Sequence, residues 1–178
     1  PVYFVLPALQ SCAPGGASPY AINTALSAAE PIGLGEIDAP EDVILDANDD
    51  LYCGSRNGDV IRFFAPDYER HEVFAHIGGS VLGLASDRAG NLLVCVGGMG
   101  LYKVTPDRRV EKLSDETSRT PWSVIDDSRL RLADDLDIAP DGKSICFAFD
   151  PQPRKQLDHC LALAEIEIES GVVREIAV

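Results

Sequence analysis

Two pairs of acidic residues are the side chains of this sequence best suited to chemistry. Glu41 and Asp42 stand before one short apolar run, and Asp134 and Asp135 stand before another. Carboxylates held close together repel one another unless protons or a cation neutralise them. Their hard oxygen atoms suit Ca²⁺ or Mg²⁺ better than Zn²⁺, so the pairs predict a divalent-cation site if the fold brings them together. In the alternative interpretation, all four carboxylates begin strands, accept backbone hydrogen bonds and face water.

The sequence contains no other pattern of residues that is typical of a catalytic site. The sequence has no GxSxG, no HExxH and no phosphate-binding loop, and the glycine-rich run 97–100 is expected to be a tight turn. The five cysteines are an odd number without CxxC spacing, so neither a zinc site nor a disulfide framework is indicated. Three of them lie in apolar runs and are expected to be buried: Cys53, Cys95 and Cys146. The three histidines are expected at the surface: His71, His76 and His159.

The net charge limits the classes of binding partner that we expect for the protein. The 178 residues carry 29 acidic and 15 basic side chains, a net charge of −14. This opposes binding to nucleic acid and favours cations, and a small-molecule substrate is the partner expected. The first apolar run, Val2–Leu9, is shorter than the ~20 residues that cross a bilayer, so no transmembrane segment is predicted. Because the sequence opens at Pro1, this run is consistent with the end of a longer signal or anchor, which favours an exported or membrane-anchored protein.

Short apolar runs separated by turn residues divide most of the chain into three repeats, near 41–76, 82–115 and 134–178. Each repeat has four runs rich in Val, Ile, Phe and Tyr, which predicts a four-stranded antiparallel meander. Repeats of ~40 residues with this pattern are typical of β-propeller blades. We therefore predict an all-β fold, with residues 1–29 as an N-terminal arm or linker and residues 30–178 as a partial β-propeller.

Two local elements are predicted around the first repeat. Glu30–Ile37 has the composition of a strand that precedes it. Asn57 and Gly58 predict a two-residue type I′ turn, which requires positive φ at both positions.

The repeats also predict where the acidic pairs meet. They align without gaps at an offset of 41 residues (Asp46 to Asp87) and then of 52 residues (Gly90 to Gly142). The first strand of each propeller blade lines the axial channel, so equivalent positions converge near its mouth. The alignment matches three pairs of residues: Glu41-Asp42, Leu82-Gly83 and Asp134-Asp135.

Three blades do not close a propeller ring. The chain is therefore expected to be a piece of a longer protein, one half of a homodimer that closes a ring, or an open stack. Extra residues between the second and third repeats, 117–131, contain Arg119, Trp122 and Arg129. They are interpreted either as the wall of a substrate entrance or as a solvated insertion.

Several segments resemble the strictosidine-synthase-like family, within the group that includes gluconolactonase, regucalcin and paraoxonase. They are GLGEIDAPEDVILD, LYCGSRNGDVIRF, LGLASDRAGNLLVCVGGMGLYKVTPDRRVEKL and RLADDLDIAPDG. The resemblance implies a six-bladed propeller with calcium or another divalent ion at the channel mouth. Glu41 and Asp42 fall on the first-blade ligand position of that group, and Asp134 or Asp135 falls on a later one.

The resemblance implies one favoured function and leaves two alternatives. The favoured function is divalent-metal-dependent hydrolysis of lactones or esters. The first alternative is a strictosidine-synthase-type carbon–nitrogen lyase or synthase, although the glutamate that the plant synthase uses has no counterpart in this sequence. The second is a non-catalytic propeller fragment that serves binding or assembly.

Overall fold

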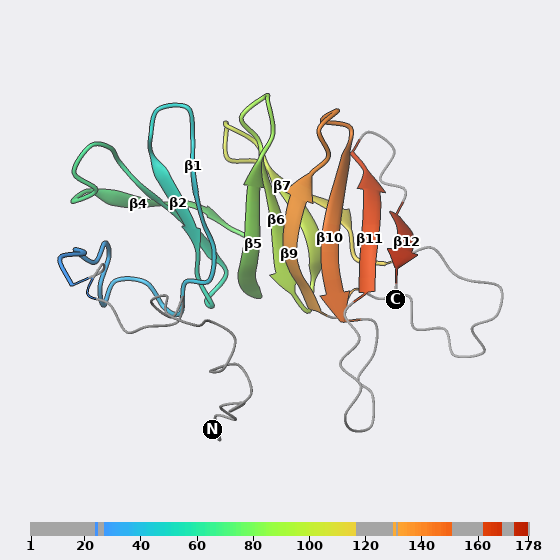
Figure 1. The fold of residues 1–178 in the computed structure, drawn as a ribbon, viewed down its shortest axis with the longest axis horizontal. Coiled ribbons are helices and arrows are strands. Elements are labelled where there is room, and N and C mark those ends of the chain that lie inside the picture. Colours follow the sequence, from blue (N-terminus) through green and yellow to red (C-terminus); the bar gives the residue numbers. More distant parts are fainter. Residues whose placement is uncertain are drawn as a thin grey trace, which may run out of the picture. The chain divides into compact units, whose positions relative to one another are not determined.

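The computed structural model describes residues 24, 27–116, 130, 132–150, 162–168 and 173–177. The chain divides into two compact units, Pro1–Pro31 and Ile32–Val178. All described strands belong to the second unit (Figure 1). Within the described ranges, there is no helix with the length and apolar character needed to cross a bilayer.

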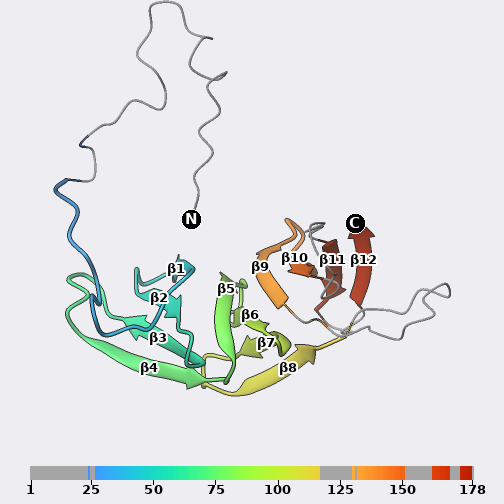
Figure 2. The same cartoon turned by 90° about the horizontal axis from the view of Figure 1, so that it is seen from below.

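The described strands form three antiparallel sheets of four strands each, and every sheet follows chain order. The first sheet contains β1 (Val43–Leu45), β2 (Leu51–Gly54), β3 (Asp59–Phe63) and β4 (His71–His76). The second contains β5 (Ser80–Ser86), β6 (Leu92–Gly97), β7 (Gly100–Val104) and β8 (Val110–Ser114). The third contains β9 (Leu132–Ile138), β10 (Ser144–Asp150), β11 (Ala162–Glu167) and β12 (Val173–Ala177). These meanders confirm the predicted blades, and Figure 2 shows β4 and β8 on the side of their sheets opposite to β1 and β5.

A three-residue loop closes the hairpin between β2 and β3. The Ser55 amide donates to the Asp59 carbonyl at 2.9 Å, and the Gly58 amide donates to the Ser55 carbonyl at 3.1 Å. Gly58 has a φ of 92°, whereas Asn57 does not have positive φ, so the predicted type I′ turn is wrong. The structure uses the three-residue loop that ends in a left-handed residue. The same hydrogen-bond pattern recurs in three other loops, with positive φ at Asp49, Gly90 and Arg108.

The strand predicted at Glu30–Ile37 is also wrong. Residues 32–38 form bends and turns, in which Gly33 and Gly35 have φ of 64° and 83°. Gly33 lies against the aromatic ring of Phe63, since an added Cβ would be 2.7 Å from its Cζ. Ile37 packs against the buried apolar cluster that contains Phe63. Of the apolar residues that suggest a strand, Ile37 therefore covers one face of the first sheet, whereas Leu34 is exposed.

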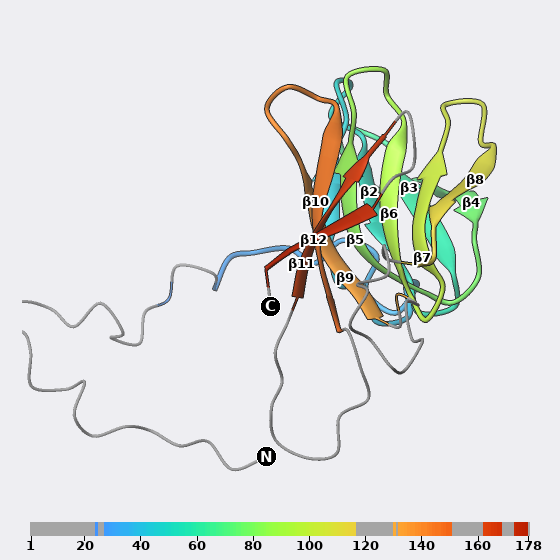
Figure 3. The same cartoon turned by 90° about the vertical axis from the view of Figure 1, so that its right-hand side faces the viewer.

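Strand β6 explains why the sheets must stack. Leu92–Val96 are all buried. Because alternate side chains of a strand point to opposite faces, both faces of β6 must be covered by other residues. Leu93 and Cys95 pack in a cluster with residues of the third sheet, such as Phe147. The intervening side chains pack with residues of the first sheet, such as Val60. The middle sheet is thus apolar on both faces, and Figure 3 views the stack from the third sheet.

The three cysteines among the described residues differ in burial according to this alternation. Cys53 and Cys95 are buried as predicted, but Cys146 is exposed. Ile145 and Phe147, its neighbours on β10, face the second sheet, so the Cys146 side chain lies on the opposite face. The prediction that it is buried is therefore wrong.

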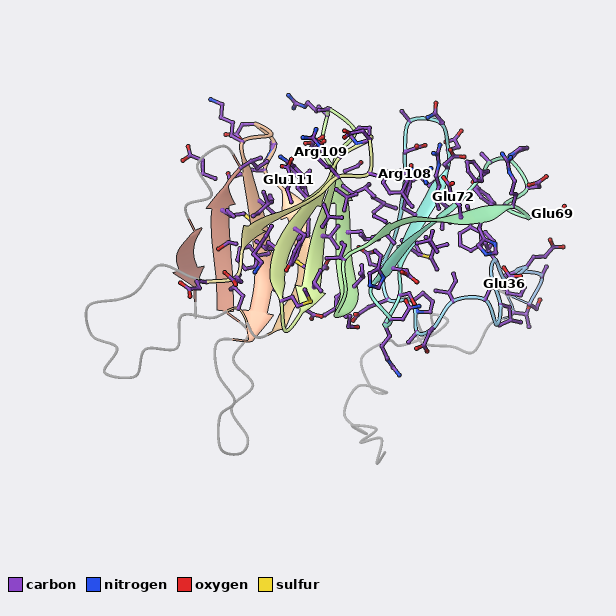
Figure 4. The ribbon with its side chains drawn as sticks, turned by 180° about the vertical axis from the view of Figure 1, so that it is seen from behind. Glu36, Glu69, Glu72, Arg108, Arg109 and Glu111 are labelled. Atoms are coloured by element: carbon purple, nitrogen blue, oxygen red, sulfur yellow. The ribbon has the colours of Figure 1, made fainter. Side chains whose placement is uncertain are left out.

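An ion pair links the outer parts of the first and second sheets. The Nη2 atom of Arg108, in the loop between β7 and β8, donates to Oε1 of Glu72 on β4 at 2.7 Å (Figure 4). The same guanidinium lies 5.3 Å from the ring centroid of Phe74. Both contacts keep β4 next to the second sheet.

Candidate functional site

The four predicted carboxylates lie around one open pocket of about 210 Å³. Glu41 and Asp42 come directly before β1, and Asp134 and Asp135 lie in β9. Gly83 of β5 is the fifth lining residue. Each of the three sheets therefore contributes its first strand, or the residues before it, to the pocket. Figure 2 shows these first strands, β1, β5 and β9, on the same side of their sheets.

The carboxylate of Asp42 bridges two sheets. Its Oδ1 accepts a hydrogen bond from the Val43 amide at 2.8 Å, within its own strand region. Its Oδ2 accepts one from the Leu84 amide of β5, also at 2.8 Å. Asp135 repeats the first of these contacts, because its Oδ1 accepts from the Leu136 amide at 2.8 Å. The alternative interpretation of carboxylates that accept backbone hydrogen bonds thus describes one member of each pair.

Glu41 is the pocket carboxylate whose protonation is perturbed. Partial removal of water around it is the largest cause that raises its pKa, followed by the negative charges of Asp134, Asp135 and Asp42. Among the described residues, neither Glu41 nor Asp134 receives a hydrogen bond at its side chain. Among the described residues, their oxygen atoms, together with Oδ2 of Asp135, are consequently the ones that remain open to a ligand in the pocket.

The chemistry of the pocket fits a hard divalent cation in donor type and charge. All side-chain donors that the described residues bring to it are carboxylate oxygens, and a cation would relieve the repulsion that acts on Glu41. As they stand, however, no three Asp, Glu, His or Cys side chains among the described residues are close enough together to hold a metal ion. The donor set fits, and cation binding would have to draw these carboxylates closer or add other donors.

A buried thiol near these charges does not extend the donor set. Burial raises the pKa of Cys95 well above its ordinary value, and the charges of Asp135, Asp134 and Asp42 add to this. The thiol therefore stays neutral, and only a thiolate would act as a nucleophile or metal ligand. The described residues therefore offer only oxygen donors to the pocket.

The histidines of β4 are exposed at the surface, as predicted, and neither of them lines the pocket. His71 Nδ1 is 3.2 Å from a Glu36 oxygen, and His76 Nδ1 is 2.7 Å from an Asp59 oxygen. Other candidates fall outside the described residues: Arg119, Trp122, Arg129 and His159. The residue that sequence reasoning missed is Gly83, whose only signal is a glycine aligned with two aspartates.

The fold and pocket define the described part of the chain as blades of a β-propeller. Residues 18–63 match the family described as "Strictosidine synthase-like, N-terminal". A search of curated proteins found no match to the chain.

Solved structures show the same fold at low sequence identity. A gluconolactonase from Xanthomonas campestris is similar at 17% identity and a TM-score of 0.61, over 79% of this chain and 48% of its own. A putative gluconolactonase is similar at 16% identity and a TM-score of 0.58, over 79% of this chain and 49% of its own. A protein of unknown function from Bacteroides thetaiotaomicron is similar at 18% identity and a TM-score of 0.53, over 78% of this chain and 35% of its own. The chain thus spans about half the length of the two gluconolactonase structures.

Proposed function

We propose that the acidic pocket binds a divalent cation, with Ca²⁺ favoured, and takes part in hydrolysis of lactones or esters. The observation that carries this proposal is the convergence of four carboxylates, from the start of β1 and from β9, on one pocket. The gluconolactonase-type fold supports the choice of reaction. The net charge of −14 supports a cation as ligand.

The four carboxylates would have different roles in such a site. Glu41 and Asp134 would bind the cation through their open oxygens, while Asp42 and Asp135 hold the strands that carry them. A bound divalent cation would polarise the substrate carbonyl and stabilise the charge that develops on its oxygen. Water would then add to the carbonyl carbon, and cleavage of the C–O bond would give a hydroxy acid or an acid and an alcohol.

A cation-binding role without catalysis is the second candidate. It is favoured by one observation: among the described residues, the pocket is lined only by four carboxylates and one glycine. Within the part of the chain that the structure describes, no histidine, serine or lysine lines the pocket to serve as base, nucleophile or oxyanion donor.

Purified protein assayed against a panel of lactones and aryl esters, with Ca²⁺ or with chelator, tests the proposal. We expect chelator-sensitive turnover that Asp134→Asn abolishes. The matched control is Asp137→Asn, because Asp137 lies on the same strand and binds the next amide at 2.8 Å but does not line the pocket. Calcium binding without turnover would favour the second candidate, and absence of both in folded protein would refute the proposal.

A further inference from the structure

We infer that Asp42 and Gly83 form a joint between the sheets that sets the width of the acidic pocket. Asp42 then acts as a positioning residue and is not a ligand of the cation. The inference rests on the proposed function for the identity of the ligand, but the joint itself rests on contacts of the described residues.

Asp42 uses both carboxylate oxygens for backbone amides. One oxygen binds Val43 next to it, and the other binds Leu84, which is 42 residues away in the second sheet. Hydrogen bonds from amides to a charged carboxylate are among the stronger ones in proteins. The contact therefore fixes the start of β1, including Glu41, against β5.

Gly83 fixes the opposite wall of the pocket by having no side chain. A Cβ at this position would lie 2.7 Å from the Asp134 carbonyl oxygen, 2.7 Å from the Asp135 Cα and 3.1 Å from Asp135 Oδ1. Two of these atoms belong to the backbone of β9, so the strand itself would have to move. Gly83 does not have positive φ, and the need for glycine here is a need for space.

The two contacts meet on consecutive residues of β5. The Leu84 amide holds Asp42, and Gly83 lets β9 approach closely. Strand β5 thereby sets the positions of Glu41 on one wall and of Asp134 on the other. A change in either contact is expected to alter the distance between the two open carboxylates.

Gly83→Ala tests the joint, with Gly54→Ala as a matched control. Gly54 also lacks positive φ and also meets a neighbouring sheet closely, because an added Cβ would be 2.8 Å from the Val81 carbonyl oxygen. Gly54 does not line the pocket. We expect both variants to lose thermal stability, whereas only Gly83→Ala weakens Ca²⁺ binding in calorimetry, by about 10- to 100-fold.

Asp42→Asn is the second variant and does not depend on tolerance of a new side chain in the core. It removes one of the two acceptors, so we expect faster hydrogen exchange at the Leu84 amide, by about tenfold, together with weaker Ca²⁺ binding. Weaker binding with unchanged exchange at Leu84 would make Asp42 a ligand and overturn the inference. Equal Ca²⁺ affinities for Gly83→Ala and Gly54→Ala would overturn it as well.

Failure of the proposed function gives a different result. In that case the wild-type protein binds no Ca²⁺, and hydrogen exchange at the Leu84 amide is the only measurement that tests the joint. Faster exchange in Asp42→Asn and Gly83→Ala than in Gly54→Ala would support the joint. Equal exchange in all three variants would refute it.

Discussion

The buried carboxylate of Asp50 and the partly exposed guanidinium of Arg62 form an ion pair that holds β3 against the start of β2. Arg62 donates from Nε and Nη2 to Oδ2 of Asp50, with the Nε contact at 3.0 Å. The other oxygen of Asp50 accepts from the Ala65 amide at 2.7 Å. The guanidinium also lies 4.7 Å from the ring centroid of Phe64. Removal of Arg62 would leave the buried Asp50 carboxylate without this cationic partner.

Arg62→Ala should destabilise the chain strongly. A buried carboxylate that loses its cationic partner typically costs on the order of 3 kcal/mol. The control is Arg109→Ala, because Arg109 pairs with Asp107 through side chains that are 70% and 65% exposed. Exposed pairs contribute at most about 1 kcal/mol. Urea unfolding measures both, and equal losses of stability would contradict the role assigned to the pair of Asp50 and Arg62.

The same carboxylate predicts a loss of stability in acid. The Ala65 amide is the largest cause that lowers the pKa of Asp50, and Arg62 lowers it further, against the opposing effect of burial. A folded-state pKa below the unfolded value stabilises the protein above the ordinary aspartate range, and this stabilisation is lost as pH falls through the lowered pKa. Unfolding experiments between about pH 5 and 2 should show this fall, with a smaller slope in Asp50→Asn. An identical slope in the variant would assign the acid sensitivity to other groups.

The blades are predictable from sequence because their signal repeats. Apolar runs alternate with turn residues at a near-constant spacing, and twelve described strands follow them. Local conformation is less predictable, because it depends on contacts made across the fold. Gly58, for example, lies so close to Gly78 that an added Cβ would be 2.4 Å from its Cα, and no local pattern reveals this contact. Cys146 is exposed because, among the described sheets, a neighbour packs against only one face of β10.

The repeat alignment predicts which carboxylates share the pocket, but it does not predict their separate roles. The first member of each pair, Glu41 or Asp134, faces the pocket without a hydrogen-bond donor among the described residues. The second member binds an amide of its own strand. Sequence alone gives all four residues the same chemistry. Backbone geometry distinguishes them, because only the structure shows which oxygens the amides occupy.

Glu41→Gln should weaken cation binding and leave the cation-free chain equally stable or slightly more stable. The pKa of Glu41 is raised by lost water and by three neighbouring carboxylates, so its charged form is disfavoured in the folded state. Removal of the charge relieves this repulsion near pH 7. Thermal unfolding with chelator and calorimetry with Ca²⁺ measure the two effects, and Glu36→Gln is the control at an exposed site that pairs with His71. A marked loss of stability without Ca²⁺ would show that Glu41 has a structural role.

Thiol labelling tests the two-sided burial of the middle sheet. Cys53 and Cys95 are buried, and burial raises the pKa of Cys53 to about 11, whereas Cys146 is exposed. At pH 8 a thiol with a pKa of 11 is ionised in roughly one molecule in a thousand, and alkylation requires the thiolate. Iodoacetamide should therefore modify Cys146 rapidly in native protein and reach Cys53 and Cys95 only after denaturation, as peptide mass spectrometry can show. Cys146→Ser identifies the rapid product, and fast native labelling of Cys95 would mean that the second and third sheets do not pack as described.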